Sequence, residues 1–242
     1  MRKILLTLLV GLGCMAANAQ STNFCGEHKM DSIHHNEVEA YTQLGTNILT
    51  NFYGGLTGTY THHFDKHWAV DGGMSYQFKK RLLGLSARGR YHFNWTSHSD
   101  FYVSARFLFN RYFGYSTNEL IGNVSVTWET SYFNMTLGES YIHFNTMKAG
   151  YTEPLTLTFG IGVNIRRRNN PWNIGLFFRN YDDFYYENWN INWGLRFYSP
   201  IPWVKNKNIK LFGEFNVRPA GSMSQLATKY EGHLKLGIKH VW

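Results

Sequence analysis

The chain ends in the stretch YEGHLKLGIKHVW, residues 230–242, and this stretch decides the fold. Counting back from the last residue in steps of two separates its side chains into two faces. One face consists of Trp242, His240, Ile238, Leu236 and Leu234, and the other of Val241, Lys239, Gly237, Lys235 and His233. Strict alternation is a period-two signal, so the stretch is predicted to be a strand with one apolar side and one polar side.

The N-terminus has the three parts of a secretory signal peptide. Arg2 and Lys3 form the charged region, residues 4–10 the apolar core, and residues 17–19 a small-x-small cleavage site. The apolar run is too short to span a bilayer. Cys14 leaves a second interpretation open, a lipoprotein cleaved just before it, although the Gly-Leu-Gly ahead of it matches the usual lipoprotein signal poorly. Removal of the predicted signal, residues 1–19, takes two cations from a formal net charge of +8.

Residues 20–36 are polar and show no periodicity, so we expect a flexible N-terminal segment. Without the signal peptide, Cys25 is the only cysteine, and no intramolecular disulfide can form. Cys25, His28 and the pair His34-His35 resemble metal ligands in type, but their spacing does not match a closed zinc motif. We therefore expect no metal and no cofactor.

Residues 37–242 form a series of alternating segments separated by short polar turns. Strands are expected near residues 39–50, 54–64, 68–78, 82–93, 100–111, 118–128, 131–140, 154–166, 172–181, 188–198, 208–218 and 230–242. Each is close to the roughly 9–11 residues that a tilted membrane-crossing strand needs. After the signal, no stretch has the ~18 or more apolar residues of a membrane helix. The prediction is an all-β fold, a transmembrane antiparallel up-and-down β-barrel of about twelve strands.

Composition supports strands and turns. Aromatic residues make up 17% of the chain, with 23 glycines and only 5 prolines. The mean hydropathy of −0.35 would argue against a membrane protein. A barrel escapes that argument, because every second residue faces the lumen and can be polar.

Tryptophan positions distinguish a membrane barrel from a soluble β-sandwich, whose strands alternate in the same way. If the N-terminus begins in the periplasm, six of the eight tryptophans fall at periplasmic strand ends or turns. These are Trp68, Trp95, Trp128, Trp172, Trp203 and Trp242, whereas Trp189 and Trp193 do not fit. A belt of this kind is expected at a membrane interface, where an amphipathic ring is favoured.

The lumen face is expected to be basic. Alternation places eleven cations inward: Lys79, Arg88, Arg90, Arg106, Arg166, Arg179, Arg196, Lys210, Arg218, Lys235 and Lys239. The inward carboxylates are three: Asp71, Glu129 and Glu214. Three carboxylates cannot neutralise eleven cations, so these groups must be hydrated or bind an anionic partner. An error of one residue in the register of a strand would reverse its assignments.

Four of the cations, Arg166, Arg179, Arg196 and Arg218, lie on neighbouring predicted strands. Because arginine binds carboxylates with two parallel hydrogen bonds, they are predicted to form a basic ladder for successive carboxylates of an acidic chain. Structural arginines that hold loops are the alternative.

The signal peptide and the terminal strand resemble those of bacterial outer-membrane β-barrel proteins, which commonly end in Phe or Trp after alternating apolar residues. The resemblance covers residues 37–242 and implies a location in the bacterial outer membrane, in contact with its lipid. It also implies that the terminal strand pairs with the first strand and is read by the barrel insertion machinery. In strand number and lumen charge the chain is similar to narrow twelve-stranded channels for acidic oligosaccharides, which line their pores with arginine and lysine.

Catalytic signatures are nearly absent. The sequence has no Gly-x-Ser-x-Gly elbow, no His-Glu-x-x-His and no P-loop. His98-Ser99-Asp100 comes nearest to the His and Ser pair of outer-membrane lipid hydrolases, but adjacent strand residues point to opposite faces and these three are expected in a turn. The basic charge lies in strand interiors, so nucleic acid is not an expected partner. We predict that the protein is not an enzyme.

The leading functional prediction is a passive pore with a basic lumen that prefers anionic solutes such as acidic oligosaccharides. The alternative is a non-conducting barrel, a structural or accessory part of an envelope complex. Its lumen would be plugged by residues 20–37 or by the loop around residues 141–153.

Overall fold

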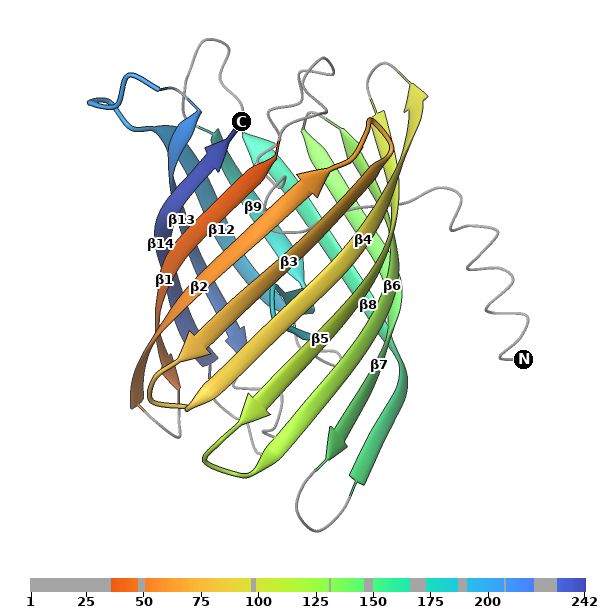
Figure 1. The fold of residues 1–242 in the computed structure, drawn as a ribbon, viewed down its shortest axis with the longest axis vertical. Helices are drawn as coiled ribbons and strands as arrows, with labels where there is room; N and C mark the ends of the chain where they lie inside the picture. The colour runs from red at the N-terminus through yellow and green to blue at the C-terminus, as the bar shows by residue number, and fades with distance from the viewer. Residues whose placement is uncertain are drawn as a thin grey trace.

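The structure is a computed structural model of the 242-residue chain. It describes residues 36–47, 51–96, 99–130, 132–145, 150–165, 173–186, 191–206, 208–219 and 230–242. The strands are β1 (Glu37–Asn47), β2 (Asn51–His63), β3 (Trp68–Gln77), β4 (Leu82–Thr96), β5 (Ser99–Tyr112), β6 (Thr117–Thr130), β7 (Phe133–Asn145), β8 (Gly150–Ile165), β9 (Asn173–Arg179), β10 (Tyr181–Asp182), β11 (Tyr185–Tyr186), β12 (Asn192–Pro200), β13 (Ile209–Pro219) and β14 (Tyr230–Val241). All except β10 and β11 pair antiparallel in one closed barrel (Figure 1), which confirms the predicted all-β fold with twelve wall strands.

The barrel closes between its first and last strands, as the terminal stretch predicted. β1 and β14 pair from Glu37 opposite Val241 to Gly45 opposite His233. Just beyond the strands, Asn36 and Trp242 exchange two backbone hydrogen bonds of 2.8 and 3.0 Å. Since β14 also pairs with β13, the last strand has a hydrogen-bonded neighbour on each side, as closure of a sheet requires.

The wall has the reverse polarity of a soluble protein. On β14, Leu234, Leu236 and Ile238 point outward and are 37–50% exposed, whereas Lys235 and Lys239 point into the lumen and are buried. β9 shows the same strict alternation of buried and exposed residues. An apolar exterior around a polar interior is stable in lipid and unstable in water, so the outer surface of this barrel is one that lipid covers. The described residues contain no helix that is both long and apolar enough to cross a membrane.

Tryptophan gathers at the terminal end of the barrel, which is the end where β1 begins and β14 ends. Trp68, Trp95, Trp128, Trp203 and Trp242 lie there, in the first or last residues of strands or just outside them. Trp193, near the start of β12, lies towards the opposite end, as predicted. Trp172 and Trp189 lie outside the described residues. Within the described part of the chain, the one-sided belt is confirmed.

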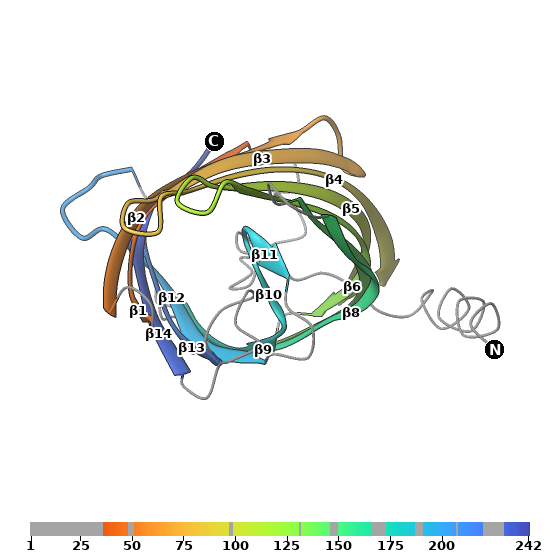
Figure 2. The ribbon, with the colours of Figure 1, turned by 90° about the horizontal axis from the view of Figure 1, so that it is seen from below.

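β9 departs from the strand expected at residues 172–181. It ends at Arg179 after 7 residues, whereas β8 beside it has 16. Asn180 fastens the chain to β8 at this point. Its backbone N–H donates to the Phe159 carbonyl (3.1 Å), and its side chain accepts from the Phe159 N–H (2.8 Å) and donates to the Leu157 carbonyl (2.6 Å). The chain then turns inward and forms the β10–β11 hairpin inside the barrel (Figure 2). Residues 180–186 are called the lumen hairpin.

Candidate functional site in the barrel lumen

The lumen hairpin presents two neighbouring carboxylates to cations of the wall. Lys235 of β14 donates from Nζ to Asp182 Oδ1 (2.8 Å) and to Asp183 Oδ2 (3.2 Å). Arg179, the last residue of β9, donates from Nη2 to Asp182 Oδ1 over 3.0 Å. The Tyr41 hydroxyl donates to Asp183 Oδ2 over 2.7 Å. The hairpin is therefore tied by ion pairs to β9 and β14, and by a hydrogen bond to β1.

A third carboxylate, Glu214 of β13, completes this network. Arg196 of β12 donates to its Oε2 from Nε over 2.6 Å and also from Nη2. Its Oε1 lies 3.3 Å from Arg179 Nη2 and 3.1 Å from Lys235 Nζ. We call the clamp the set of Arg179, Arg196, Lys235, Asp182, Asp183 and Glu214, whose side chains are 0–6% exposed. Its three cations balance its three carboxylates, which is the condition under which buried charges are tolerated.

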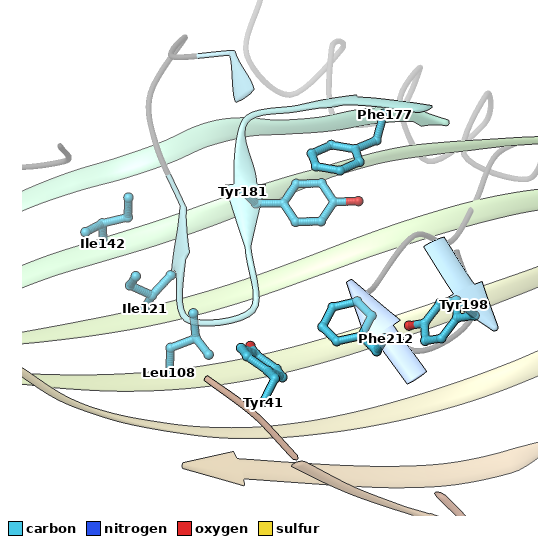
Figure 3. Packing of buried hydrophobic residues seen from close by; sticks show 8 residues of the cluster. All are labelled: Tyr41, Leu108, Ile121, Ile142, Phe177, Tyr181, Tyr198 and Phe212. Atoms are coloured by element: carbon cyan, nitrogen blue, oxygen red, sulfur yellow. The ribbon is translucent and has the colours of Figure 1, made fainter. Parts of the chain in front are cut away.

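The hairpin packs against apolar side chains of the wall inside an otherwise polar lumen (Figure 3). The buried cluster consists of Tyr41, Leu108, Ile121, Ile142, Phe177, Tyr181, Tyr198 and Phe212. Tyr181 of the hairpin lies over Gly160, where an added Cβ would be 2.8 Å from the tyrosine Oη. Phe184 lies over Gly84 in the same way, with 2.9 Å between an added Cβ and the ring. Glycines of β8 and β4 thus leave the space that the aromatic rings of the hairpin fill.

Further hydrogen bonds join the hairpin to the remaining sides of the lumen. On β5, Arg106 donates to the Asp182 carbonyl (3.2 Å) and Asn110 donates to the Phe184 carbonyl (2.8 Å). The Tyr181 hydroxyl donates to Thr136 of β7 over 3.2 Å. Together with the clamp, these contacts reach β1, β5, β7, β9 and β14, so the hairpin crosses the lumen from wall to wall.

A second group of cations lies on β4 and β5, and we call Arg88, Arg90 and Arg106 the arginine cluster. Asp71 of β3 accepts a hydrogen bond from Arg88 Nε over 2.6 Å, and the same oxygen lies 3.4 Å from Arg90 Nε. Arg106 lies directly opposite Arg88 in the pairing of β4 with β5, and Arg90 follows Arg88 by two positions on the same face of β4. Arg88 and Arg90 thus both pair with Asp71, and within the described part of the chain Nη2 of the buried Arg90 has no hydrogen-bond partner. Three guanidinium groups and one ion-paired carboxylate can attract a further anion, because the fork of a guanidinium matches a carboxylate.

Two more ion pairs lie towards the terminal end of the lumen. Lys239 Nζ is 3.1 Å from Glu37 Oε2, which joins β14 to β1. His92 Nε2 is 2.9 Å from Asp100 Oδ1, which joins β4 to β5. Asp100 therefore belongs to a strand and faces the lumen, so its expected place in a turn is wrong, while His98 lies outside the described residues.

Most of the predicted inward cations face the lumen. Those confirmed there are Arg88, Arg90, Arg106, Arg179, Arg196, Lys235 and Lys239, which are buried, and Lys210, which is half-buried on the lumen face of β13. The prediction for Lys79 is wrong, because this residue is exposed in the turn between β3 and β4. Arg166 lies outside the described residues, and Arg218 lies in β13 with a side chain that is not described. Of the predicted ladder, the structure brings Arg179 and Arg196 together on Glu214.

The prediction of only three inward carboxylates is wrong. Among the described residues, the buried charges of the lumen are seven arginines and lysines and eight aspartates and glutamates. The five carboxylates that were missed are Glu39, Asp100, Glu119, Asp182 and Asp183. Glu119 shares a face of β6 with Glu129, so alternation along the strand could have predicted that it faces the lumen. In the described part of the chain the buried charges are nearly balanced, so an anion preference has to come from local groups such as the arginine cluster.

One of the two predicted plugs is also wrong. Of residues 141–153, Tyr141–Asn145 belong to β7 and Gly150–Glu153 to β8, so both parts are barrel wall. The other predicted plug, residues 20–37, lies outside the described residues except at its last two positions, and so do Cys25, His28, His34 and His35. Within the described ranges no group of three or more metal-binding side chains is present.

A closed antiparallel barrel with an apolar exterior and a belt of tryptophan at one end is the fold of bacterial outer-membrane β-barrel proteins. No protein-family model and no curated protein sequence matches the chain. Among solved structures, it is similar to the KdgM porin in complex with disordered oligogalacturonate, with a TM-score of 0.56 and 10% identity over 85% of this chain and 99% of that chain. It is similar to the NanC porin at a TM-score of 0.55 and 10% identity, over 83% of this chain and 98% of that chain.

The fold is shared with an enzyme as well as with porins. Outer membrane phospholipase A from Escherichia coli matches with a TM-score of 0.51 and 8% identity, over 84% of this chain and 92% of that chain. At identities this low the likeness establishes the fold alone. The closed barrel and its apolar exterior confirm the predicted class, a β-barrel of the bacterial outer membrane, and these neighbours share its fold.

Proposed function

We propose that the protein is a passive outer-membrane pore that prefers anionic solutes and is not an enzyme. The observation that carries the proposal is the arginine cluster, in which Arg88, Arg90 and Arg106 are buried on the lumen side of β4 and β5 and Asp71 pairs with Arg88 and Arg90. Buried positive charge of this kind raises the local concentration of anions and lowers that of cations.

The solute class that fits is a carboxylate-bearing solute such as an acidic oligosaccharide. Each guanidinium offers a planar pair of donors, and Arg90 Nη2 is without a hydrogen-bond partner in the described part of the chain. The KdgM porin, solved with oligogalacturonate, has a similar fold, which supports the same class of solute by analogy. Barrel insertion machinery and outer-membrane lipid are the other partners we propose, the former through the terminal strand and the latter through the apolar exterior.

The test is the reversal potential of the purified protein in a planar bilayer under a potassium chloride gradient. We expect anion preference in the wild type and a clear loss of it in the double variant Arg88→Gln/Arg90→Gln. The matched control is Arg111→Gln, because Arg111 lies on the outward face of β5 and donates to Asn118. Heat-modifiable migration on gels checks that each variant has folded as a barrel.

Two outcomes would contradict the proposal. Cation preference in the wild type would exclude selection by the arginine cluster. Absence of conductance in correctly folded protein, both without and with a dicarboxylate such as succinate, would favour the non-conducting accessory barrel instead.

A further inference from the structure

Asp182 and Asp183 occupy a basic site of the wall as a bound dicarboxylate would. Their carboxylates lie on adjacent residues at the hairpin and accept hydrogen bonds from Lys235, Arg179 and the Tyr41 hydroxyl. The two aspartates and their charged partners, Arg179 and Lys235, are all buried. Each carboxylate is therefore removed from water and held by charge-assisted hydrogen bonds.

The cations and the carboxylates come from parts of the chain that differ in how they are held. Arg179, Arg196 and Lys235 belong to wall strands that are hydrogen-bonded into the barrel. The two aspartates belong to a hairpin whose strands form a two-stranded sheet of their own. Its hydrogen bonds with β1, β5, β7 and β14 each use a side chain, whereas Asn180 at its base bonds to the backbone of β8. The hairpin beyond Asn180 can therefore leave β1, β5, β7 and β14 without breaking a backbone ladder.

Without the hairpin, Arg179, Arg196 and Lys235 would lose two of the three carboxylates of the clamp and would keep Glu214. Arg179, Arg196 and Lys235, three of the residues predicted to bind an anionic solute, thus contact carboxylates of the protein itself.

We propose that the lumen hairpin is an internal pseudo-ligand, and that an anionic solute with two neighbouring carboxylates competes with Asp182 and Asp183 for this site and releases the hairpin into an open state. The proposal rests on the proposed function, since it assigns regulation to the same pore. Because a tethered group acts at an effective concentration of about millimolar or more, a solute with one carboxylate competes poorly and a dicarboxylate competes better.

Hairpin release is measured directly by the reactivity of a cysteine placed on it. In a Cys25→Ser background, Phe184→Cys puts a thiol on the hairpin, and its rate of reaction with a charged, membrane-impermeant thiol reagent reports exposure. We expect succinate to raise this rate by about tenfold over acetate at equal ionic strength. Adding Asp182→Asn/Asp183→Asn should raise the rate without succinate and abolish the response to it.

The matched control is Asp100→Asn, which neutralises a buried lumen carboxylate that lies 2.9 Å from His92 Nε2, towards the terminal end of the barrel. This variant should leave both the basal rate and the succinate response unchanged. Equal rates with succinate and acetate, or an equal effect of Asp100→Asn and the double aspartate variant, would overturn the proposal. If the double variant loses heat-modifiable migration, Tyr41→Phe removes only the hydroxyl bonded to Asp183 and should raise the rate by a smaller factor.

A disulfide lock tests whether the movement controls conduction. An ideal Cβ on Gly84 lies 3.4 Å from Phe184 Cγ, so the pair Gly84→Cys/Phe184→Cys is placed to form a disulfide between β4 and the hairpin. The oxidised protein should lose most of the succinate-dependent current and regain it on reduction. Unchanged current in the oxidised protein would show that the hairpin does not gate the pore.

The outcomes separate this inference from the proposed function. A thiol that responds to succinate in a barrel without anion preference would support the pseudo-ligand and reject anion selection. Anion preference with a thiol that ignores succinate would do the reverse.

Discussion

The clamp and the arginine cluster are built from the same kinds of residue and differ in how their charge is balanced. Both bring three cations into the lumen on neighbouring strands, and in both the cations are buried. In the clamp, three carboxylates pair with three cations, and two of those carboxylates come from the lumen hairpin. In the arginine cluster, Arg88 and Arg90 share one carboxylate, that of Asp71.

This difference shows that a cation that faces the lumen need not bind a solute. Alternation along a strand tells which residues face the lumen, because successive side chains point to opposite sides. The role depends on what else occupies the lumen. A cation met by a carboxylate of its own chain holds the structure together, whereas a cation left in excess attracts a solute.

The largest difference between the clamp and the arginine cluster is expected when the shared carboxylate of each is removed. Glu214→Gln leaves Arg179, Arg196 and Lys235 without the carboxylate that all three contact. Removing one partner of a fully buried ion pair costs about 3–5 kcal/mol, and we expect a decrease of that order in the free energy of unfolding. The measurement is urea-induced unfolding in lipid vesicles, followed by tryptophan fluorescence.

Asp71→Asn is the matched variant in the arginine cluster. The Asp71 side chain is 10% exposed, against 0% for Glu214, and its cluster already holds more cations than carboxylates. We therefore expect a smaller loss of stability together with a stronger anion preference. Equal destabilisation by the two substitutions would show that the clamp and the cluster are the same kind of site.

A smaller effect is expected at the glycine under the hairpin. Gly160→Ala would put a Cβ 2.8 Å from the Tyr181 hydroxyl, closer than real Cβ contacts, so the ring must move. Overpacking of this kind costs about 1–3 kcal/mol, and the hairpin should become easier to label at Phe184→Cys. Gly122→Ala is the control, since an added Cβ at Gly122 of β6 meets no atom within 4 Å. Similar labelling in the two variants would mean that Tyr181 does not hold the hairpin.

The sequence predicted the wall of the barrel well for a physical reason. A strand between lipid and lumen must alternate apolar and polar side chains, and twelve strands could be recognised by this pattern, with β14 as the clearest. Their ends were less certain. β7 runs to Asn145 and β8 begins at Gly150, so a segment expected as a loop is largely strand.

The lumen hairpin could not be predicted from alternation, because it lies inside the barrel and side chains on both of its faces are buried. Residues 179–183 are five consecutive buried positions, which no wall strand can produce. The only local signal is that alternation fails after Phe178, where Asn180 stands at the next outward position and the neighbouring aspartates follow. Its partners, such as Tyr41 and Lys235, are distant in sequence, and ion pairs between distant residues leave no periodic trace.

The smallest effect that would separate the two regions is their response to salt. Raising the ionic strength from about 0.1 M to 1 M shortens the screening length from about 10 Å to 3 Å. The arginine cluster acts on solutes in the aqueous lumen, so the anion preference of the wild type should fall across this range. In Arg90→Gln, which removes one of the three cations, the preference should start lower and change less.

The clamp should not respond in the same way. Its side chains are in direct hydrogen-bond contact and are 0–6% exposed, so mobile ions cannot enter between them. The difference in unfolding free energy between wild type and Glu214→Gln should therefore stay within about 0.5 kcal/mol between low and high salt, as expected for pairs that are screened little. The measurements are reversal potentials and urea unfolding at both salt concentrations. A clamp that weakens with salt as the anion preference does would place its charges in contact with water, and the distinction between a structural and a solute-binding group of cations would fail.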